Sequence, residues 1–360
     1  MKEIPKKSNK IFLSEKVILL LAIIVGLGIL YLLLRKIGID KVIHNFKTFP
    51  ILGFIPIFTI TVLSILVTCE KWKLILKAYG HNIRFSRLLI FKLAGWAVSY
   101  LTPSLFVGGE PVRAYMAKKE EKVPWSHALS SIVADKALEG AVGSFVVLLG
   151  IIFLFFRNFL SSGIKILLLI LVIFFIYLLL RLFKSGKRGF VASVLHFLHL
   201  DKLRTFRAWQ EKIANFDRSL SSLFKDHKKT FFFGLALSCI SCALALLRYK
   251  AIVYFLGLDI SLYQIIIIYA LTVLVVVVPF IPGAFGTYES VQAFSFALLG
   301  LGAQTGITCI FVMRIMDLIL VGLGLVFLSY FGLMKLGKLY WIIWRVGNKN
   351  NKFSKHEEKK

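Results

Sequence analysis

Nine long runs of apolar residues divide this sequence, and they constrain its fold more than any other feature. A helix needs about 20 mostly apolar residues to cross a bilayer. Hydrophobic residues make up 58% of the 360-residue chain, and its mean hydropathy is +0.81, whereas soluble domains hold roughly 45–50% apolar residues. We therefore expect an all-α polytopic membrane bundle. The runs cover residues 17–34, 51–69, 88–107, 128–156, 164–182, 230–247, 262–281, 284–301 and 307–334.

Lysine and arginine residues gather between these runs and predict the orientation. The net charge of +27 would suit nucleic-acid binding, but cations that flank apolar spans instead suit membrane topology and anionic headgroups. Eleven cations lie in residues 183–229 and eight in residues 335–360, whereas residues 248–261 hold two. We therefore expect a multi-pass protein of the cell membrane with both termini in the cytoplasm, in contact with anionic lipids and not with nucleic acid. Residues 35–50, with four cations, fit the external side poorly.

The sequence also matches itself at an offset of about 178 residues. The ordered matches are Trp72-Lys73 with Tyr249-Lys250, Gly80 with Gly257, Asn82-Ile83 with Asp259-Ile260, Pro103 with Pro282, Glu110 with Glu289, and Lys136-x-x-Glu139 with Arg314-x-x-Asp317. Matches in the same order at one offset indicate an internal duplication.

The duplication predicts two membrane repeats. Repeat 1 covers residues 17–156 with a Pro/Gly hairpin at about 88–122, and repeat 2 covers residues 157–334 with a hairpin at about 262–301. Three crossings and one re-entrant hairpin in each repeat would invert the second copy, and hairpins that cross fully would leave this parity unchanged. Inverted repeats with interrupted helices are typical of transporters whose substrate site lies near the midplane. The remaining segments are basic cytoplasmic ends at 1–16 and 335–360, and a basic amphipathic cytoplasmic insert at 183–229, which would lie on headgroups or cap the bundle.

Proline and glycine residues interrupt both hairpins where a half-helix would begin. They are Pro103, Gly108 and Gly109 before Glu110, and Pro282, Gly283 and Gly286 before Glu289. Proline breaks the incoming helix, and glycine permits a tight turn and close backbone approach. The free amides at the start of the next helix favour an anion such as phosphate, and Arg113 could supply a planar fork to its oxygens. Alternatively, Glu110 satisfies the helix start itself and the turn is purely structural.

Charged residues inside apolar runs are the other candidate site residues. Asp135, Lys136 and Glu139 lie early in one run, and Arg314 and Asp317 lie well inside another. A spacing of three places Lys136 and Glu139 on one helix face, and likewise Arg314 and Asp317. Each such charge costs about 2.5–3.5 kcal/mol at the bilayer centre. Charges of this kind are retained mainly for substrate, ion or proton pathways. The alternatives are a salt bridge that locks the bundle and, for the first set, extension to the surface.

No motif for bond chemistry is present in the sequence. There is no nucleophile elbow, P-loop, HExxH or dinucleotide fingerprint. Cys239 and Cys242 form a CxxC inside an apolar run, where packing is the better interpretation than redox or zinc chemistry. We therefore expect no catalytic residue, no metal and no cofactor.

These motifs together resemble a known family. Trp72-Lys73, Gly80, Pro103, Gly109-Glu110-x-x-Arg113, Pro282-Gly283-x-x-Gly286-x-x-Glu289 and Arg314 resemble the lysylphosphatidylglycerol synthase transmembrane-region family, also described as flippase-like. The resemblance covers about residues 15–335 and implies a lipid-translocating membrane domain. In some members this domain precedes a soluble aminoacyl-transfer domain; in others it stands alone or accompanies a glycosyltransferase. We expect a stand-alone member without the soluble synthase domain.

Two departures from the family pattern bear on the substrate. The family commonly has Glu-Arg and a later Asp where this chain has Asp135-Lys136 and Glu139, and Ala284 replaces the second glycine of its second hairpin. Because a lysine is not a bidentate fork, the lipid need not be a phosphatidylglycerol derivative.

We predict a flippase-like transporter, not an enzyme, that moves an anionic phospho- or polyprenyl-phosphate-linked lipid across the cytoplasmic membrane. The expected substrate-binding residues are Glu110, Arg113, Lys136, Glu139, Glu289, Arg314 and Asp317, of which the cations would bind the headgroup and the carboxylates would balance their charge. The alternative is a membrane subunit or scaffold of a lipid-modifying aminoacyl or glycosyl transferase. The sequence is compatible with a homodimer.

Overall fold

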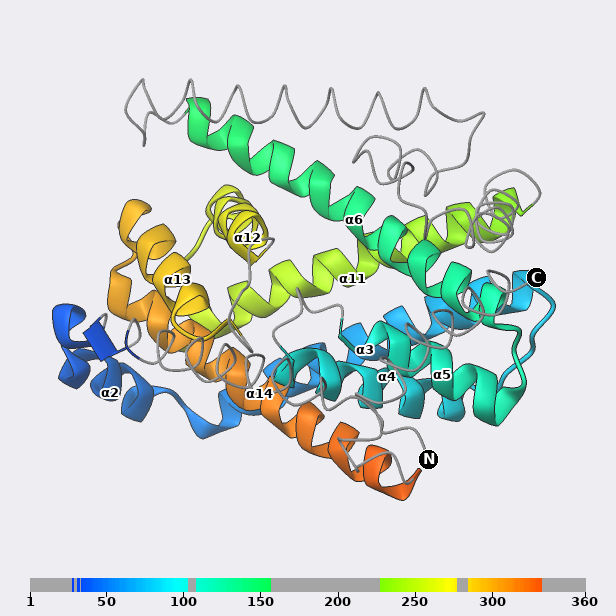
Figure 1. The fold of residues 1–360 in the computed structure, drawn as a ribbon. Coiled ribbons are helices and arrows are strands. Elements are labelled where there is room, and N and C mark those ends of the chain that lie inside the picture. The colour runs from blue at the N-terminus through cyan, green and yellow to red at the C-terminus, as the bar shows by residue number, and fades with distance from the viewer. Residues whose placement is uncertain are drawn as a thin grey trace, which may run out of the picture.

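The computed structural model describes residues 28, 31–32, 34–102, 108–156, 227–276 and 284–331, and each regular element within them is a helix (Figure 1). The all-α prediction is therefore confirmed. The elements are α2 (Ile39–Thr48), the 3-10 turn η1 (Ile51–Gly53), α3 (Phe54–Ala78), α4 (Phe85–Leu101), α5 (Glu110–Glu121), α6 (Trp125–Phe156), α11 (Lys228–Phe255), α12 (Leu262–Val276), α13 (Thr287–Leu298) and α14 (Ala303–Tyr330).

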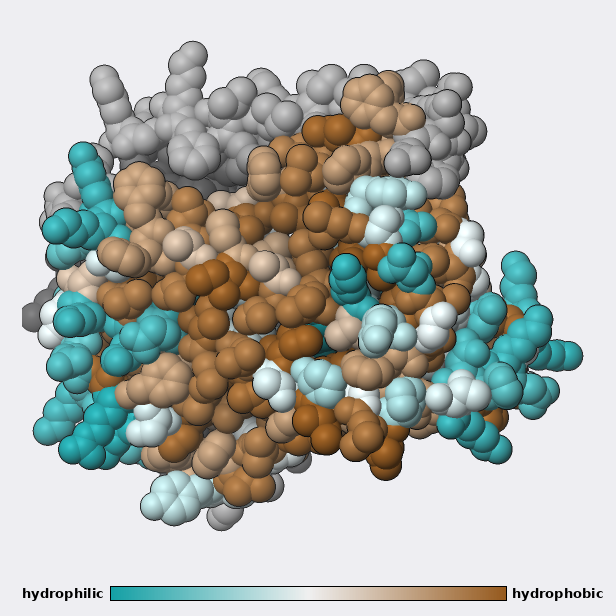
Figure 2. Space-filling model, turned by 180° about the vertical axis from the view of Figure 1, so that it is seen from behind, coloured by the Kyte–Doolittle hydropathy of each residue, from teal (hydrophilic) through white to brown (hydrophobic). Residues whose placement is uncertain are grey.

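Four segments are long and apolar enough to cross a membrane. They are η1 with α3, then α6, α11 and α14, and their mean hydropathies lie between 2.2 and 2.4. Their 28 to 32 residues, at about 1.5 Å per residue, exceed the roughly 30 Å thickness of the hydrocarbon core. Figure 2 shows a broad apolar face with hydrophilic side chains gathered along two opposite edges. A surface of this kind is suited to lipid on its sides and to water at its two ends.

Two pairs of shorter helices occupy the predicted hairpin positions. The pair α4 and α5 has 17 and 12 residues, and the pair α12 and α13 has 15 and 12. Helix α5 begins at Glu110 with Pro111 in its first turn, and α13 begins after Gly286, whose φ of 80° favours glycine. The predicted helix starts near Glu110 and Glu289 are confirmed. Re-entry of these helices into the membrane stays a prediction.

Several predicted features lie outside the described residues. They are Pro103, Pro282, Gly283, the basic ends 1–16 and 335–360, and all but the last three residues of the insert 183–229.

The helices pack in a pattern that follows the predicted correspondence of the repeats. Helix α3 packs against its counterpart α11, α6 packs against α12, and α14 packs against α4 (Figure 1). If the two predicted repeats are exchanged, the pairing of α3 with α11 maps onto itself. The pairing of α6 with α12 then maps onto the pairing of α14 with α4. The hydroxyls of Ser64 and Ser241, which are 177 residues apart, lie 3.4 Å from each other between α3 and α11. Counterpart positions therefore meet, while the inverted orientation stays a prediction.

Glycines on the two long helices permit the closest of these contacts. A Cβ added at Gly150 of α6 would overlap the Cβ of Ala270 on α12, and one added at Gly324 of α14 would overlap the backbone oxygen of Leu93 on α4. Small residues let membrane helices approach until their backbones touch. The long helix of each predicted repeat therefore lies against a short helix of the other.

Replacing Gly324 with alanine tests this contact. We expect Gly324→Ala to lower the thermal unfolding temperature of the detergent-purified protein, because overpacking of a close contact costs about 1–3 kcal/mol. Gly322→Ala is the matched control, since a Cβ at Gly322 meets nothing within 4 Å. Alanine there is expected to be neutral or slightly stabilising through its higher helix propensity. Equal melting temperatures for the two variants would show that the approach of α14 to α4 is not tight.

Candidate functional site

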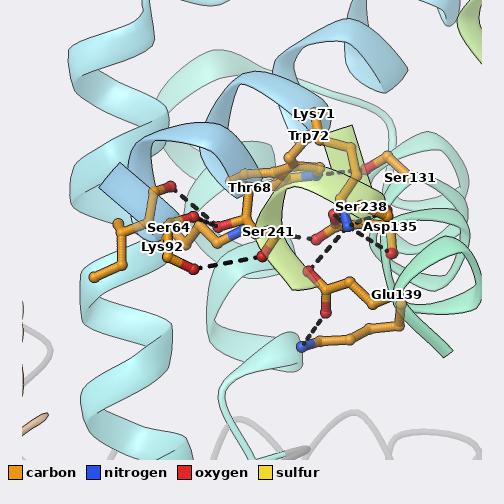
Figure 3. A network of polar contacts seen from close by, with 12 residues as sticks. Ser64, Thr68, Lys71, Trp72, Lys92, Ser131, Asp135, Glu139, Ser238 and Ser241 are labelled. Carbon is orange, nitrogen blue, oxygen red and sulfur yellow. Dashed lines mark hydrogen bonds and ion pairs between the residues drawn. The ribbon is translucent and has the colours of Figure 1, made fainter. Parts of the chain in front are cut away.

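Seven charged side chains from four helices of repeat 1 form what we call the first charge cluster. Its members are Lys71 of α3, Lys92 of α4, Glu110 and Arg113 of α5, and Asp135, Lys136 and Glu139 of α6. Figure 3 shows part of this network. The cluster brings together all four residues that the sequence analysis expected to bind substrate in this half, namely Glu110, Arg113, Lys136 and Glu139.

Asp135 is the centre of the first charge cluster, and its side chain is fully buried. Its Oδ1 lies 3.0 Å from Nζ of Lys71, and its Oδ2 lies 3.0 Å from Nη2 of Arg113. Nζ of Lys92 lies 3.9 Å from the same Oδ2. A carboxylate buried in an apolar bundle requires such partners, because an isolated buried charge is far costlier than a paired one. Cations from three other helices therefore converge on one carboxylate of α6.

Lys71 was not among the predicted site residues, yet it is the best-satisfied cation of the cluster. Its side chain is fully buried, and its Nζ lies 2.9 Å from Oε1 of Glu139 and donates hydrogen bonds to Oγ of Ser238 at 3.2 Å and to the backbone oxygen of Asp135 at 3.1 Å. The apolar run ended at residue 69, which made Lys71 look like a flanking cation, but α3 continues to Ala78 and carries it into the bundle.

Arg113 reaches Asp135 through a gap that two glycines leave. A Cβ at Gly95 of α4 would lie 2.6 Å from Cγ of Arg113, and one at Gly109 would overlap the backbone oxygen of Gly95. The Gly109 amide donates to Oγ of Ser99 at 2.8 Å, and the Arg113 guanidinium stacks on Trp72 with its carbon 4.2 Å from the ring centroid. The predicted close backbone approach at Gly109 is confirmed, and Gly108 lies in the turn just before it.

Lys136 and Glu110 form the outer edge of the cluster. Nζ of Lys136 lies 3.1 Å from Oε2 of Glu139 and 3.8 Å from Oε1 of Glu110, and the Lys136 side chain is half exposed. The predicted pair on one face of α6 is therefore present. The exposure of Lys136 also fits the alternative that this cation extends toward the surface.

The second charge cluster comprises Arg248 of α11, Glu289 of α13, and Arg314 and Asp317 of α14. Nε of Arg314 lies 2.6 Å from Oε1 of Glu289, and its Nη1 donates to the Tyr100 hydroxyl of α4 at 3.0 Å. Nη2 of Arg248 lies 3.1 Å from Oδ1 of Asp317. Arg314 and Asp317 share a helix face as predicted, but each pairs with another helix and not with its neighbour.

Glu289 and Glu110 hold counterpart positions but behave differently. Oε2 of Glu289 accepts a hydrogen bond from the Gly286 amide at 2.8 Å, so this residue closes the start of its own helix. Among the described residues, which leave out 103–107, Glu110 makes no such bond and no side chain caps α5. The structural alternative raised for Glu110 therefore describes its counterpart Glu289 in α13, whereas for α5 both interpretations stay predictions.

One ion pair recurs in both clusters. Lys71 pairs with Glu139, and Arg248 pairs with Asp317. Lys71 and Arg248 are 177 residues apart, and Glu139 and Asp317 are 178 apart, which is the offset of the predicted duplication. Both cations directly precede the repeated Trp72-Lys73 and Tyr249-Lys250 motifs, so the repeat itself carried a signal for Lys71 and Arg248.

The described residues contain no group of three or more histidine, cysteine, aspartate or glutamate side chains that could hold a metal ion. Both clusters consist of cations and carboxylates that lie within 4 Å of one another. Such groups can bind, release and exchange an ionic partner, and they can move protons.

Long apolar helices with ion-paired sites between them define a helical integral membrane protein. The chain belongs to the family described as the lysylphosphatidylglycerol synthase TM region, whose model matches residues 19–324. The resemblance expected from the hairpin motifs is thereby confirmed.

Curated proteins that are similar to this chain are named UPF0104 membrane proteins. A UPF0104 membrane protein of Methanothermobacter thermautotrophicus is 25% identical over 73% of this chain and 80% of its own length. One from Methanocaldococcus jannaschii is 30% identical over 39% of this chain and 40% of its own. One from Pyrococcus horikoshii is 24% identical over 78% of this chain and 87% of its own. These names describe membrane proteins and give no activity. No solved structure matches the chain significantly.

A double-mutant cycle tests the recurring ion pair. Arg248→Met alone leaves the Asp317 carboxylate without its partner and is expected to cost up to about 3–5 kcal/mol, whereas Arg248→Met with Asp317→Leu is expected to recover most of this loss. Thermal unfolding in detergent measures both. The exposed Arg87–Glu121 pair, with 2.6 Å between its charged atoms, is the control; Arg87→Met is expected to cost less than about 1 kcal/mol. A double variant no more stable than Arg248→Met would contradict the pairing.

Proposed function

We propose that this protein translocates an anionic phospho- or polyprenyl-phosphate-linked lipid across the cytoplasmic membrane, without forming or breaking covalent bonds. The observation that carries the proposal is the burial of two charge clusters between apolar helices. Charges kept inside a membrane bundle at such cost belong mostly to pathways for substrates, ions or protons. The headgroup would pass these charges while its acyl or prenyl chains stay in the bilayer.

The arrangement of the clusters supports a transporter more than a static lock. One cluster lies beside each pair of short helices, and the same ion pair recurs at counterpart positions of the two repeats. Transporters built from repeats place their substrate site where interrupted helices of the two halves meet. The contact of Arg314 with Tyr100 joins the second cluster to α4 of the first repeat.

The family description supports a lipid substrate. It names the membrane region of a lysylphosphatidylglycerol synthase, whose product is a lipid with a phosphate in its headgroup. We carry over only this lipid class.

The proposed orientation places both termini in the cytoplasm. The cations of residues 1–16 and 335–360 support it through the positive-inside rule. A reporter that is active only in the cytoplasm, fused separately to each terminus, is expected to give a signal at both ends. A signal at one end only would contradict this topology.

The alternative function, a membrane subunit or scaffold of a lipid-modifying transferase, is supported by the same description, because it refers to part of a synthase. The two functions differ in one measurable property. A transporter moves lipid when it is purified and alone, whereas a scaffold does not.

Reconstitution into liposomes tests translocation directly. Purified protein is offered fluorescent phosphatidylglycerol, its lysyl ester and a short polyprenyl phosphate, and an impermeant reductant bleaches the label that reaches the outer leaflet. We expect the wild type to accelerate bleaching of at least one lipid. The double variant Glu289→Gln/Arg314→Gln keeps a polar pair and removes its charges. It is expected to be at least about tenfold slower, because electrostatic contact with the phosphate is lost.

The control for this assay is Arg87→Gln/Glu121→Gln, which neutralises the exposed pair and is expected to leave the rate unchanged. A normal rate in the Glu289→Gln/Arg314→Gln variant would make that pair a structural lock. If folded wild-type protein moved none of the three lipids, the transferase alternative would take its place.

A further inference from the structure

The first charge cluster carries one more positive than negative charge. Its buried core contains Lys71, Lys92 and Arg113 against Asp135 and Glu139. Its outer edge adds Lys136 and Glu110, which balance each other. The second charge cluster, with two arginines and two carboxylates, is neutral. The excess positive charge is therefore specific to the first cluster and lies in its buried part.

Lys92 accounts for this excess. Its Nζ is buried and has no hydrogen-bond partner among the described residues, and its nearest carboxylate oxygen there, Oδ2 of Asp135 at 3.9 Å, is already held by Arg113 at 3.0 Å. Lys71 has four oxygen partners by comparison. Nε of Arg113 is also buried without a partner. Nζ of Lys92 and Nε of Arg113 therefore remain unused as donors, although both side chains face Asp135.

The direction of the Lys92 side chain is unusual for a membrane helix. Lysine normally lays its apolar stem along the bundle and extends its ammonium to water. Here the side chain is 15% exposed while its Nζ is buried, so the charged end points inward. Figure 3 shows the Lys92 side chain extending toward the network that contains Asp135. A cation held inside the bundle without an adequate partner is costly, and an anion at this position would remove that cost.

We infer that Lys92 and the Nε edge of Arg113 bind one phosphate group of a phosphodiester lipid headgroup. This inference rests on the proposed function and names the substrate class of its first cluster. A phosphodiester carries one negative charge near neutral pH, which equals the excess of the cluster, whereas a phosphate monoester carries about −1.5 to −2. In a medium of low dielectric constant, this balance favours the diester. Lys92 supplies a point charge and Arg113 a directed donor.

The test measures binding separately from transport. The full-length protein in detergent is titrated with short-chain phosphatidylglycerol, short-chain phosphatidic acid and inorganic phosphate, and both affinity and the ligand-induced rise in melting temperature are recorded. We expect phosphatidylglycerol to bind most tightly. Lys92→Gln is expected to weaken its binding about tenfold or more, as the loss of a charged hydrogen bond implies. Lys92→Arg is expected to retain it.

Melting without ligand separates a binding role from a structural one. Because Lys92 has no adequate partner when the site is empty, Lys92→Gln is expected to leave the ligand-free melting temperature unchanged or to raise it. Lys77→Gln, at an exposed lysine near the end of α3, is the control and is expected to alter neither quantity. A lower ligand-free melting temperature with unaltered lipid binding would make Lys92 a structural counter-ion and overturn the inference.

Three further outcomes assign failures unambiguously. Equal affinity for inorganic phosphate and the lipid would overturn the assignment to a lipid headgroup. If the wild type transports lipid in the liposome assay but Lys92→Gln binds lipid normally, the inference fails and the proposed function stands. Lipid binding that depends on Lys92 in a protein that transports no lipid would support the binding site and refute the transport function alone.

Discussion

The cost of burying charge between apolar helices governs how the described part of this protein is assembled. The side chain of Asp135 is fully buried, so its carboxylate is stable only where cations reach it. Those cations come from α3, α4 and α5, and Ser238 of α11 completes the coordination of Lys71. Because one carboxylate collects partners from so many helices, the position of each helix depends on the others. Glycine contacts bring the backbones close, and the buried charges fix their register.

The same constraint joins the two repeats. The second charge cluster resembles the first in its ion pair between Arg248 and Asp317, but its other arginine, Arg314, also holds Tyr100 of α4. Lys92 and Gly95 on α4 contribute to the first cluster at the same time. Helix α4 therefore contacts both clusters. A displacement of α4 would therefore change the partners of Asp135 in one cluster and of Arg314 in the other.

The sequence predicted the parts of this structure that depend on local patterns. Hydropathy located α6, α11 and α14, and the Pro/Gly interruptions located the starts of α5 and α13. Side-chain contacts between residues that are distant in the sequence were not predicted. Periodicity suggested that Arg314 and Asp317 belong together, whereas their partners Glu289 and Arg248 come from other helices. Lys71 was overlooked because hydropathy falls at residue 70, although the helix continues. Lys92 was overlooked because it lies inside the apolar run that begins the predicted first hairpin.

A transport site must bind its substrate without retaining it. Four cations with no carboxylates would hold a phosphate so tightly that release would become slow, and a fully neutral site would not attract it. In the first charge cluster, Asp135, Glu139 and Glu110 compensate all but one of the positive charges. In the proposed site, the single remaining charge equals that of one phosphodiester, and the carboxylates keep the other cations paired whether or not the lipid is bound. Carboxylates in a cation-rich membrane site therefore serve release as much as stability.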